Sequence, residues 1–588
     1  MAVMSGSEAV VQSLIAEGVE HVFGIPGYHS EHLYGRLMKQ DKIRHVLVRH
    51  EQGAGYMAIG AAQVTGRPAT ILSTAGPGAL NAATPMGEAY GDGVPILNIM
   101  AEDMSPHLYQ DRGIVHESKD QFGVFSRLSQ WSQQTSSPSE IPSAIHEGLR
   151  QMQVNRPRPV VVEIPIDVFQ ADAEVELMAA ETHEPPAGNP SDLERIAGIL
   201  AKAERPLIWA GGGVIRAGAG RQLTALAEQL QIPVLLTTTS KGAIPEDHPL
   251  VIGNLSQHGP VRRFMEQADV MLAVGARFSY LSSGKWTLPV PKRLLHIDID
   301  PTQPGKNFPA ELGVHADAKL ALTALVTATA DAGTPDHDQW IAQGQSAREE
   351  VRAELAQRAP LEWGLMKSIR NALPKDAIVA CDPHLLGYWS REHLPFYQPR
   401  TWLYGLAFGT LGYSYPVALG AKIVAPNQPV VSLTGDGGFL FTAQEMSTAV
   451  QQGLNVPVII MNDNAYGAIK EDFVRDYNNA YEVDLHNPDF VKYAEAFGAV
   501  GLRATPETLE STIREALELD RPSLIDVPVN LQRPLQVVAA LVSNLHCFDH
   551  AQMLAFLQVA YHFQTTHEQL AEAELEEKQK DAPPNVLE

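Results

Sequence analysis

Two aspartates of this chain each stand at the end of an apolar run, where a carboxylate could bind a metal ion. The segment Leu433–Gly467 reads LTGDGGFLFTAQEMSTAVQQGLNVPVIIMNDNAYG, and Asp436 and Asp463 follow its two strand-like runs, 27 residues apart. One helix between the runs would bring both strand ends to the same edge of a parallel sheet. Two carboxylates and a diphosphate provide the oxygen ligands that octahedral Mg²⁺ prefers. The pair therefore predicts a magnesium–diphosphate site, in preference to two aspartates that only cap helices.

The glycines on either side of Asp436 fit the same interpretation. Gly435, Gly437 and Gly438 leave the backbone free of side chains at the strand end. Backbone amides without side chains can come close to an anion, and the start of a following helix adds its positive end. We expect these three residues to receive phosphate oxygens.

Strand-like runs alternate with helical segments along most of the chain, in three successive blocks. Buried parallel strands joined by crossover helices explain this alternation. The polar, Pro- and Gly-bearing segments Ala171–Asp192 and Ala328–Gln339 break the pattern and read as linkers. The predicted fold class is α/β, with three doubly wound parallel-sheet domains in series plus a helical C-terminal tail. The predicted domains are residues 1–172, 190–330 and 355–535, and the predicted tail is residues 536–588.

Composition and charge narrow the class of protein. The chain has 588 residues, enough for several cores, and its formal net charge of −24 argues against a general nucleic-acid binder. Cys381 and Cys547 are too few for a disulfide framework, which favours a reducing compartment. The N-terminus lacks a basic and apolar leader, and no apolar run reaches about 18 residues. We expect no membrane span and a cytoplasmic location.

The charged tail reads as a solvated end, in preference to a segment that packs over a neighbouring subunit or an active site.

On these residues the chain resembles the thiamine diphosphate-dependent enzymes, and within them the acetolactate synthase and pyruvate oxidase group. Their cofactor motif is GDG followed by NN after one helix and one strand. The resemblance implies thiamine diphosphate and Mg²⁺ as cofactors. It also implies Asp436, Asp463 and the backbone carbonyl of Ala465 as metal ligands, with Tyr466 beside the cofactor. The chain departs from the motif at Asp463, where the family has its second asparagine. An aspartate keeps the oxygen and adds a negative charge.

A second group of motifs resembles the part of the family site that holds the pyrimidine ring. Glu51 lies in LVRHEQGAGYMAIG at the end of a strand, where the family has the glutamate that protonates a ring nitrogen. The alternative for Glu51 is a carboxylate that only stabilises the first turn of its helix. Its neighbours GIPG, with Pro26, and STAGPGALN, with Gly76 and Asn81, follow in family order and favour the cofactor role.

The segment FGTLGYSYPVALGAK resembles the family stretch that bends the cofactor. The resemblance implies that Leu411 wedges the cofactor into a V shape and that the Gly409 carbonyl accepts a hydrogen bond from the pyrimidine amino group.

The resemblance implies small-molecule carbonyl substrates and a reaction that makes or breaks a C–C bond. His29 and Gln110 are the candidate residues near the reacting centre: His29 can relay protons, and Gln110 aligns with a glutamine of acetolactate synthases. Our first hypothesis is an acetolactate synthase-like enzyme that decarboxylates a 2-oxo acid and ligates the product to a second carbonyl. The alternatives are a benzaldehyde lyase-like enzyme acting on aldehydes and 2-hydroxy ketones, suggested by His29, and a non-catalytic cofactor-binding subunit. Asp472 stands where acetolactate synthases have a tryptophan.

Two further expectations come with the resemblance. FAD is possible but not favoured, because the Gly-rich turn within Trp209–Gly218 is not GxGxxG. A homodimer or homotetramer is expected, with active sites at the subunit interface.

Overall fold

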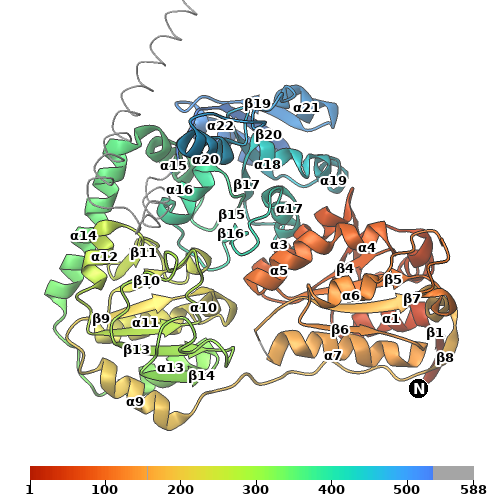
Figure 1. The fold of residues 1–588 in the computed structure, drawn as a ribbon, viewed down its shortest axis with the longest axis horizontal. Helices are drawn as coiled ribbons and strands as arrows, with labels where there is room; N and C mark the ends of the chain where they lie inside the picture. The colour runs from red at the N-terminus through yellow and green to blue at the C-terminus, as the bar shows by residue number, and fades with distance from the viewer. Residues whose placement is uncertain (155, 534–588) are drawn as a thin grey trace, which may run out of the picture. The chain divides into compact units, whose positions relative to one another are not determined.

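The computed structural model describes residues 1–154 and 156–533. Within these residues three six-stranded sheets follow one another along the chain, and every strand in each of them pairs in parallel with its neighbours. Helices lie on both faces of each sheet (Figure 1). The predicted fold class is confirmed for these three domains. The predicted tail, with Cys547, lies outside the described residues, and the predicted domain boundaries stay a prediction.

The N-terminal domain has the strand order β3-β2-β4-β5-β7-β6. The inner strands β4, β5 and β7 are mostly apolar and fully buried, as expected for a sheet covered on both faces, whereas the edge strands β3 and β6 are more polar. The strands are β2 (His21–Gly24), β3 (Arg44–Leu47), β4 (Ala69–Ser73), β5 (Ile96–Glu102), β6 (Trp131–Gln134) and β7 (Val160–Pro165). The helices are α1 (Gly6–Ala16), α2 (Glu31–Leu37), α3 (Glu51–Thr65), α4 (Pro77–Asn81), α5 (Ala83–Asp92), α6 (Gln121–Ser126), α7 (Ile141–Val154) and α8 (Ile166–Gln170).

The central domain has the strand order β11-β10-β9-β12-β13-β14 and its own apolar core. The strands are β9 (Pro206–Ala210), β10 (Val234–Leu236), β11 (Val251–Gly253), β12 (Val270–Val274), β13 (Arg293–Asp298) and β14 (Leu312–His315). The helices are α9 (Pro190–Leu200), α10 (Gly212–Arg216), α11 (Gly220–Leu230), α12 (Gly259–Met265), α13 (Ala318–Ala328) and α14 (Asp338–Arg358).

The C-terminal domain has the strand order β16-β15-β17-β18-β20-β19, so the two strands of the opening motif, β17 and β18, are direct neighbours. The strands are β15 (Ile378–Cys381), β16 (Trp402–Tyr404), β17 (Val430–Gly435), β18 (Pro457–Asn462), β19 (Val500–Arg503) and β20 (Ser523–Pro528). The helices are α15 (Pro360–Ala372), α16 (Leu385–His393), α17 (Ser414–Val424), α18 (Asp436–Leu440), α19 (Met446–Gln452), α20 (Gly467–Tyr477), α21 (Phe490–Ala496) and α22 (Leu509–Glu518).

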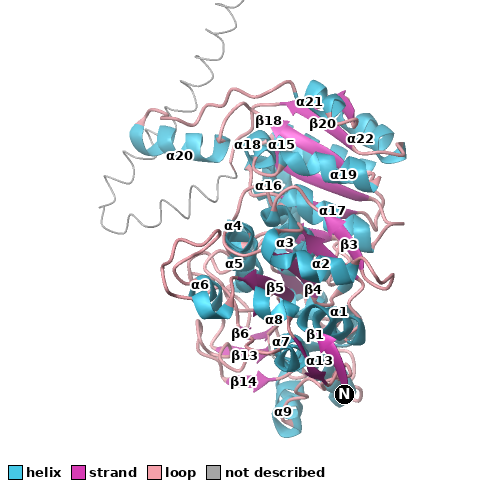
Figure 2. Ribbon diagram, turned by 90° about the vertical axis from the view of Figure 1, so that its right-hand side faces the viewer, coloured by secondary structure: helices cyan, strands magenta, loops and turns pink. Residues whose placement is uncertain are grey.

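Helices α3 and α17 pack side by side and join the N-terminal and C-terminal domains (Figures 1 and 2). A methyl group built on Gly60 would lie 2.0 Å from the carbonyl oxygen of Val417, and one on Gly420 would lie 1.9 Å from that of Met57. Both positions therefore require glycine, because any side chain would push the helices apart. One continuous apolar core includes buried side chains from both domains.

Two details differ from the sequence-based expectations. The predicted linker Ala171–Asp192 begins with a strand, β8 (Asp172–Val175), which pairs antiparallel with β1 (Ala2–Ser5). Alternate residues of this strand are acidic and exposed, so the strand has the two-residue period of an edge strand but is only four residues long. The segment between β17 and β18 is two helices, α18 and α19, joined by the 3₁₀ turn Ala443–Glu445, rather than one helix. Among the described residues no helix is both long and apolar enough to cross a bilayer.

Candidate active site

The two aspartates of the opening motif lie together at the carboxyl edge of the C-terminal sheet. Strand β17 ends immediately before Asp436, which begins α18, and β18 ends immediately before Asp463. Gly435 pairs with Met461 across the two strands, so the two aspartates follow adjacent strand ends, close enough for the charge of Asp436 to act on Asp463. The structure thus brings together the pair that the spacing predicted.

Burial dominates the electrostatics of these two aspartates. Burial, followed by the nearby charge of Asp436, raises the pKa of Asp463, and burial raises the pKa of Asp436. Asn487 donates a hydrogen bond from Nδ2 to Asp436 Oδ2 at 2.6 Å, while its own Oδ1 is buried without a partner among the described residues. Two adjacent carboxylates and an unsatisfied amide oxygen are a donor set that a hard divalent cation fits.

The predicted glycines surround the same point with little free space. A methyl group built on Gly437 would lie 2.7 Å from the ring of Tyr466, and one on Gly438 would lie 2.8 Å from Asp382 Oδ2. Ala465 is buried and forms an isolated bridge with Asp484. The predicted residues of this half of the site are therefore neighbours in space.

Glu51 begins helix α3 at the carboxyl end of β3, as the sequence indicated. The side chain is 8% exposed, and its Oε2 accepts a hydrogen bond from Asn81 Nδ2 at 3.0 Å. Its Oε1 has no hydrogen-bond partner among the described residues and faces Gly78, where a built methyl group would lie 3.0 Å away. Asn81 therefore fixes one of the two carboxylate oxygens.

The backbone before Glu51 is held by a residue of the C-terminal domain. Glu445, which is fully buried, accepts hydrogen bonds from the backbone N–H groups of Arg49 and His50, each at 3.1 Å to Oε1. Burial raises the pKa of Glu445 to about 7, although these hydrogen bonds oppose the shift. The start of α3 is thus positioned from the domain that carries Asp436.

The loop that carries Gly409 and Leu411 is also fixed between domains. Glu88 of α5 accepts hydrogen bonds from the backbone N–H groups of Phe408 at 3.3 Å and Thr410 at 3.4 Å. Gly409 is exposed, with a φ of +69° and open space around its Cα, and Leu411 is half-buried. The Gly409 carbonyl and the Leu411 side chain are therefore on a loop that the first domain holds.

Glu88 predicts a pH dependence of stability. Burial, followed by the charge of Asp92, raises the pKa of Glu88 to about 8, so the folded protein binds this proton more tightly than the unfolded chain. The stabilisation is complete below the unfolded pKa and is lost as the pH rises toward 8. The apparent Tm of the wild type should fall by a few degrees more than that of Glu88→Gln between pH 6 and pH 8.5, measured by differential scanning fluorimetry. The exposed Glu20→Gln is the control, and equal slopes for all three proteins would contradict the prediction.

The other predicted site residues differ in their exposure to solvent. His29 lies in the 3₁₀ turn Tyr28–Ser30 after β2 and is 1% exposed, and Gly76 is buried at the end of β4. Pro26 is exposed. Gln110 is exposed as well, and its Nε2 donates to the carbonyl oxygen of Pro106 at 2.7 Å. The structure does not bring Gln110 into the group around Glu51.

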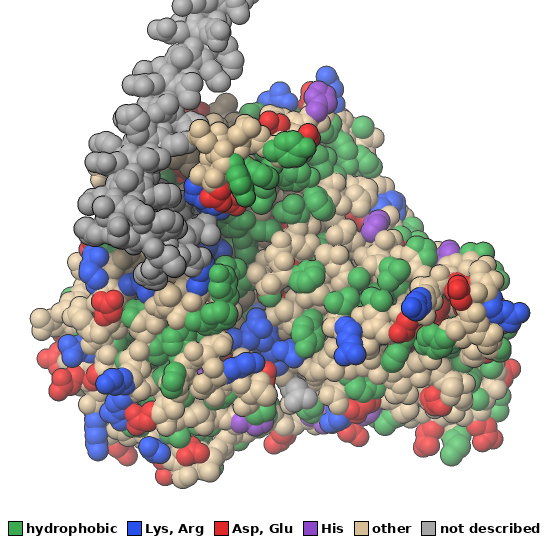
Figure 3. Space-filling view, in the orientation of Figure 1, with side chains coloured by type: hydrophobic (Ala, Val, Ile, Leu, Met, Phe, Trp, Pro, Cys, Tyr) green, Lys and Arg blue, Asp and Glu red, His purple; other side chains and the backbone are tan. Residues whose placement is uncertain are grey.

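A cavity of about 360 Å³ lies between the N-terminal and central domains, within the part of the chain that the structure describes. Gly211–Gly213, which begin α10, line it together with Arg156, Arg216, Arg277 and Asp298. On the face of the molecule that Figure 3 draws, Lys and Arg side chains gather in a hollow. An anionic ligand would suit the arginines. The expectation that FAD is possible but not favoured stays a prediction.

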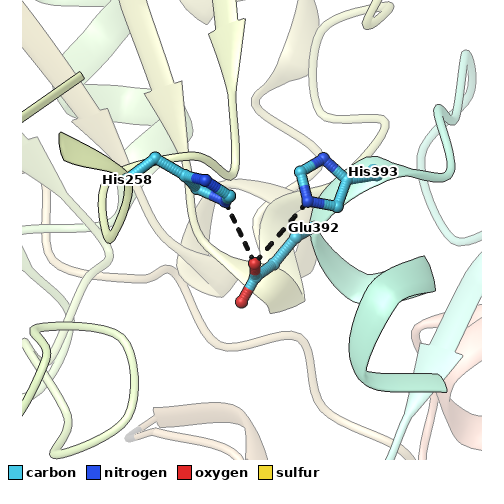
Figure 4. Close-up of side chains that lie close together, drawn as sticks. All are labelled: His258, Glu392 and His393. Carbon is cyan, nitrogen blue, oxygen red and sulfur yellow. Dashed lines mark hydrogen bonds and ion pairs between the residues drawn. The ribbon is translucent and has the colours of Figure 1, made fainter. Parts of the chain in front are cut away.

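A separate buried cluster joins the central and C-terminal domains (Figure 4). His258 Nε2 lies 3.2 Å and His393 Nε2 lies 3.9 Å from Glu392 Oε2, and Arg391 lies 3.4 Å from the other carboxylate oxygen. Burial opposes ionisation of Glu392, but the His258 hydrogen bond and the Arg391 charge lower its pKa to about 2. Because Arg391 already balances the single carboxylate, the cluster reads as a contact between domains rather than a cation site.

Comparisons with known proteins match this architecture domain by domain. Three family models match the chain: the thiamine pyrophosphate enzyme N-terminal TPP-binding domain at residues 4–124, the central domain at 193–325, and the C-terminal TPP-binding domain at 386–527. A probable 2-ketoarginine decarboxylase from Pseudomonas aeruginosa is 36% identical over 89% of this chain and 94% of its own length. This chain belongs to the thiamine diphosphate-dependent enzymes.

Other relatives place the enzyme in the acetolactate synthase group. An acetolactate synthase large subunit from Corynebacterium glutamicum is 34% identical over 89% of this enzyme and 86% of its own length. A probable acetolactate synthase large subunit from Methanocaldococcus jannaschii is 31% identical over 91% and 93% of the two chains. The predicted resemblance is confirmed, and the enzyme is a thiamine diphosphate-dependent decarboxylase or carboligase.

Sequence reasoning missed three residues that the structure places in the two groups: His116, Glu445 and Asn487. His116 lies in the loop between β5 and α6, and its carbonyl oxygen would be 2.3 Å from a methyl group built on Gly76. Asn487 lies in a loop with no motif of its own, 51 residues after Asp436. Glu445 stood within the opening segment but read as an ordinary helix residue.

Proposed function

We propose that this enzyme uses thiamine diphosphate and Mg²⁺ to decarboxylate a 2-oxo acid. The observation that carries the proposal is the pairing of Asp436 with Asp463 at neighbouring strand ends, in a chain that also presents a buried Glu51 with one free carboxylate oxygen. The relative named as a 2-ketoarginine decarboxylase supports decarboxylation of a 2-oxo acid as the chemistry.

The carboxylates of Asp436 and Asp463 and the carbonyl oxygen of Ala465 would hold the metal ion. The amide groups of the glycines at 435, 437 and 438 would receive the diphosphate at the start of α18. Asp463, in place of an asparagine, adds one negative charge to this set. A divalent cation relieves the repulsion between the two buried carboxylates, which supports its presence.

The cofactor supplies an electron sink that stabilises the negative charge left on carbon when CO₂ departs. Glu51 would hold a proton against a ring nitrogen of the cofactor through its free Oε1, while Asn81 fixes Oε2. Leu411 and the carbonyl of Gly409 would orient the ring from the loop that Glu88 holds. The burial of Glu51 excludes water from this proton.

We propose a homodimer as the smallest active unit. In the described chain no hydrogen bond or ion pair links Glu51 to the Asp436 group, which supports a site that a second copy completes. Exposed large apolar side chains lie close in sequence to both halves, which is typical of a surface that another copy covers. They are Tyr28, Leu80, Val115 and Val124 in the first domain, and Phe408, Leu440, Phe441 and Ile469 in the third.

Ligation to a second carbonyl compound is the second candidate outcome, favoured by the acetolactate synthase relatives. One feature of this chain speaks for a different pocket. Asp472 of α20, at the position of the synthase tryptophan, accepts a hydrogen bond from Arg533 at 2.7 Å and lies 2.7 Å from Arg475. A carboxylate paired with two arginines thus stands where the synthases have an aromatic ring. A different kind of acceptor carbonyl compound would fit beside it.

A substrate panel tests the proposal. Apo-protein reconstituted with both thiamine diphosphate and Mg²⁺ should release CO₂ from at least one of pyruvate, phenylpyruvate and 5-guanidino-2-oxopentanoate, followed by coupled CO₂ assay and mass spectrometry. Either cofactor alone should give no turnover. Acyloin cleavage without CO₂ release would instead support the lyase alternative, and a protein inactive on every 2-oxo acid and acyloin would support a non-catalytic subunit.

A further inference from the structure

Two histidine side chains meet between the strand ends that carry the Glu51 group. The imidazole rings of His29 and His116 have centroids 5.1 Å apart and an angle of 37° between their planes. His29 follows β2 and His116 follows β5, and these two strands flank β4, which leads into Gly76. Four neighbouring strands, β3, β2, β4 and β5, thus deliver Glu51, His29, Gly76 and His116 to one edge of the sheet.

Neither ring is used by the protein itself. Nδ1 of His29 and Nδ1 of His116 are both buried without a hydrogen-bond partner among the described residues, and their other ring nitrogens form no hydrogen bond there either. Buried polar atoms in folded proteins are nearly always hydrogen-bonded, so two unsatisfied imidazoles in contact need an explanation. A bound ligand or a transferred proton supplies one, whereas two histidines that only filled a core would each be expected to find a partner.

The neighbours of His29 shift its pKa in opposite directions. Burial and then the neighbouring His116 lower the pKa of His29, and Asp103 raises it. Asp103 is 8% exposed and its Oδ2 also lacks a partner among the described residues. The exposed ring of Tyr28 packs edge-on against His29. Two imidazoles in contact resist being charged together, so the pair favours a state that carries at most one extra proton.

We propose that His29 and His116 are the proton-donating pair of the reaction, and that the enzyme therefore releases its decarboxylated product as an aldehyde. This inference rests on the proposed function. In the balanced reaction, a 2-oxo carboxylate and one proton give an aldehyde and CO₂. The bond between the carboxylate and carbonyl carbons breaks, and its electron pair takes up the proton from the imidazole pair. The pair is recharged with a proton from solvent.

Comparison of two assays separates proton delivery from the earlier steps. The first assay measures aldehyde formed from the best 2-oxo acid of the panel. The second measures CO₂ release with ferricyanide. Two ferricyanide ions each accept one electron after CO₂ has left and water supplies the oxygen, so the product leaves as a carboxylic acid and needs no proton on carbon. His29→Gln and His116→Gln keep a polar side chain that does not titrate. His32→Gln is the matched control, because His32 is a partly exposed histidine of the same domain that bonds to Gln170.

A positioned general acid contributes about 10²–10⁴-fold to a rate. Each of the two variants should therefore lose aldehyde formation by at least about 100-fold and keep ferricyanide-coupled CO₂ release within about threefold of the wild type. In D₂O, the wild-type aldehyde should carry deuterium on the former carbonyl carbon. Aldehyde formation within about threefold of the wild type in both variants would overturn the proposal. So would an equal loss in both assays, because the histidines would then act before CO₂ leaves.

A measurement on the apo-protein tests the pair without turnover. NMR of ¹³Cε1-labelled histidine, with the His29 signal assigned by its loss in His29→Gln, gives the pKa of His29 directly. His116→Gln should raise this pKa and Asp103→Asn should lower it, because the two neighbours act with opposite sign. No change in either variant would overturn the electrostatic pairing. A wild-type enzyme that releases no CO₂ from any 2-oxo acid would count against the proposed function, whereas, if the wild type is active, the results for the histidine variants test only the proposed role of His29 and His116.

Discussion

Replacing Glu51 with glutamine should lower kcat by at least about 10³-fold while leaving the protein folded, since general acid–base groups contribute about 10²–10⁴-fold. Glutamine can still accept the hydrogen bond from Asn81, but it cannot hold a proton for the cofactor ring. The loss should appear with saturating thiamine diphosphate and Mg²⁺, measured as CO₂ release from the best substrate of the panel.

Two controls make this result specific. Glu20→Gln removes an exposed carboxylate from the same domain and should retain wild-type kcat. Binding of thiamine diphosphate to Glu51→Gln, followed by quenching of intrinsic fluorescence, should stay within about tenfold of the wild type, or about 1.4 kcal/mol. A Glu51→Gln enzyme with more than a tenth of the wild-type kcat would contradict the role assigned to Glu51.

The second large effect concerns the metal ligands. Asp436→Ala should weaken Mg²⁺-dependent binding of thiamine diphosphate by about 10- to 100-fold, because a charge-assisted contact contributes about 1.5–3 kcal/mol and 1.4 kcal/mol is tenfold. The substitution also frees Asn487 from its 2.6 Å hydrogen bond to Asp436. Isothermal titration calorimetry of the apo-protein at fixed Mg²⁺ measures the change.

Asp463→Asn is the informative companion to Asp436→Ala. It restores the amide that the family motif has at this position and removes one of two adjacent buried carboxylates. We expect cofactor binding within about tenfold of the wild type, a difference of about 1.4 kcal/mol or less. Equal, severe losses in Asp436→Ala and Asp463→Asn would show that the extra charge at 463 is itself required. Unchanged binding in Asp436→Ala would contradict the assignment of a metal site to this sheet edge.

The sequence predicted the fold and the placement of Asp436 and Asp463 at neighbouring strand ends because both depend on local patterns. Apolar runs that end in glycine and aspartate identify parallel strands and their carboxyl ends, and the sheet order then makes Asp436 and Asp463 neighbours. The strand β8 does alternate polar and apolar residues, Asp172, Ala173, Glu174 and Val175, as a half-buried strand should. It is short, and the Pro- and Gly-bearing residues that follow it favoured a linker for the whole segment.

The missed residues of the site depend on contacts between distant parts of the chain. His116 follows an irregular loop with left-handed backbone at Tyr109 and Asp111, and nothing local fixes which of its side chains turns toward Gly76. Gln110, the residue of this loop that the resemblance places near the reacting centre, has an exposed side chain. Glu445 acts on backbone groups that lie 395 and 396 residues away along the chain. Such pairs are decided by tertiary packing rather than by sequence neighbours.

The contact of Glu445 with the backbone of Arg49 and His50 also limits how this protein can be recombined with its relatives. The N-terminal domain looks like a separable module, yet the start of α3 is fixed by a carboxylate nearly 400 residues downstream. A chimera that exchanged the first domain alone would inherit Glu51 without the side chain that holds it. Exchange is expected to preserve the site only where the donor of the first domain also supplies the 3₁₀ turn with Glu445 and helix α17.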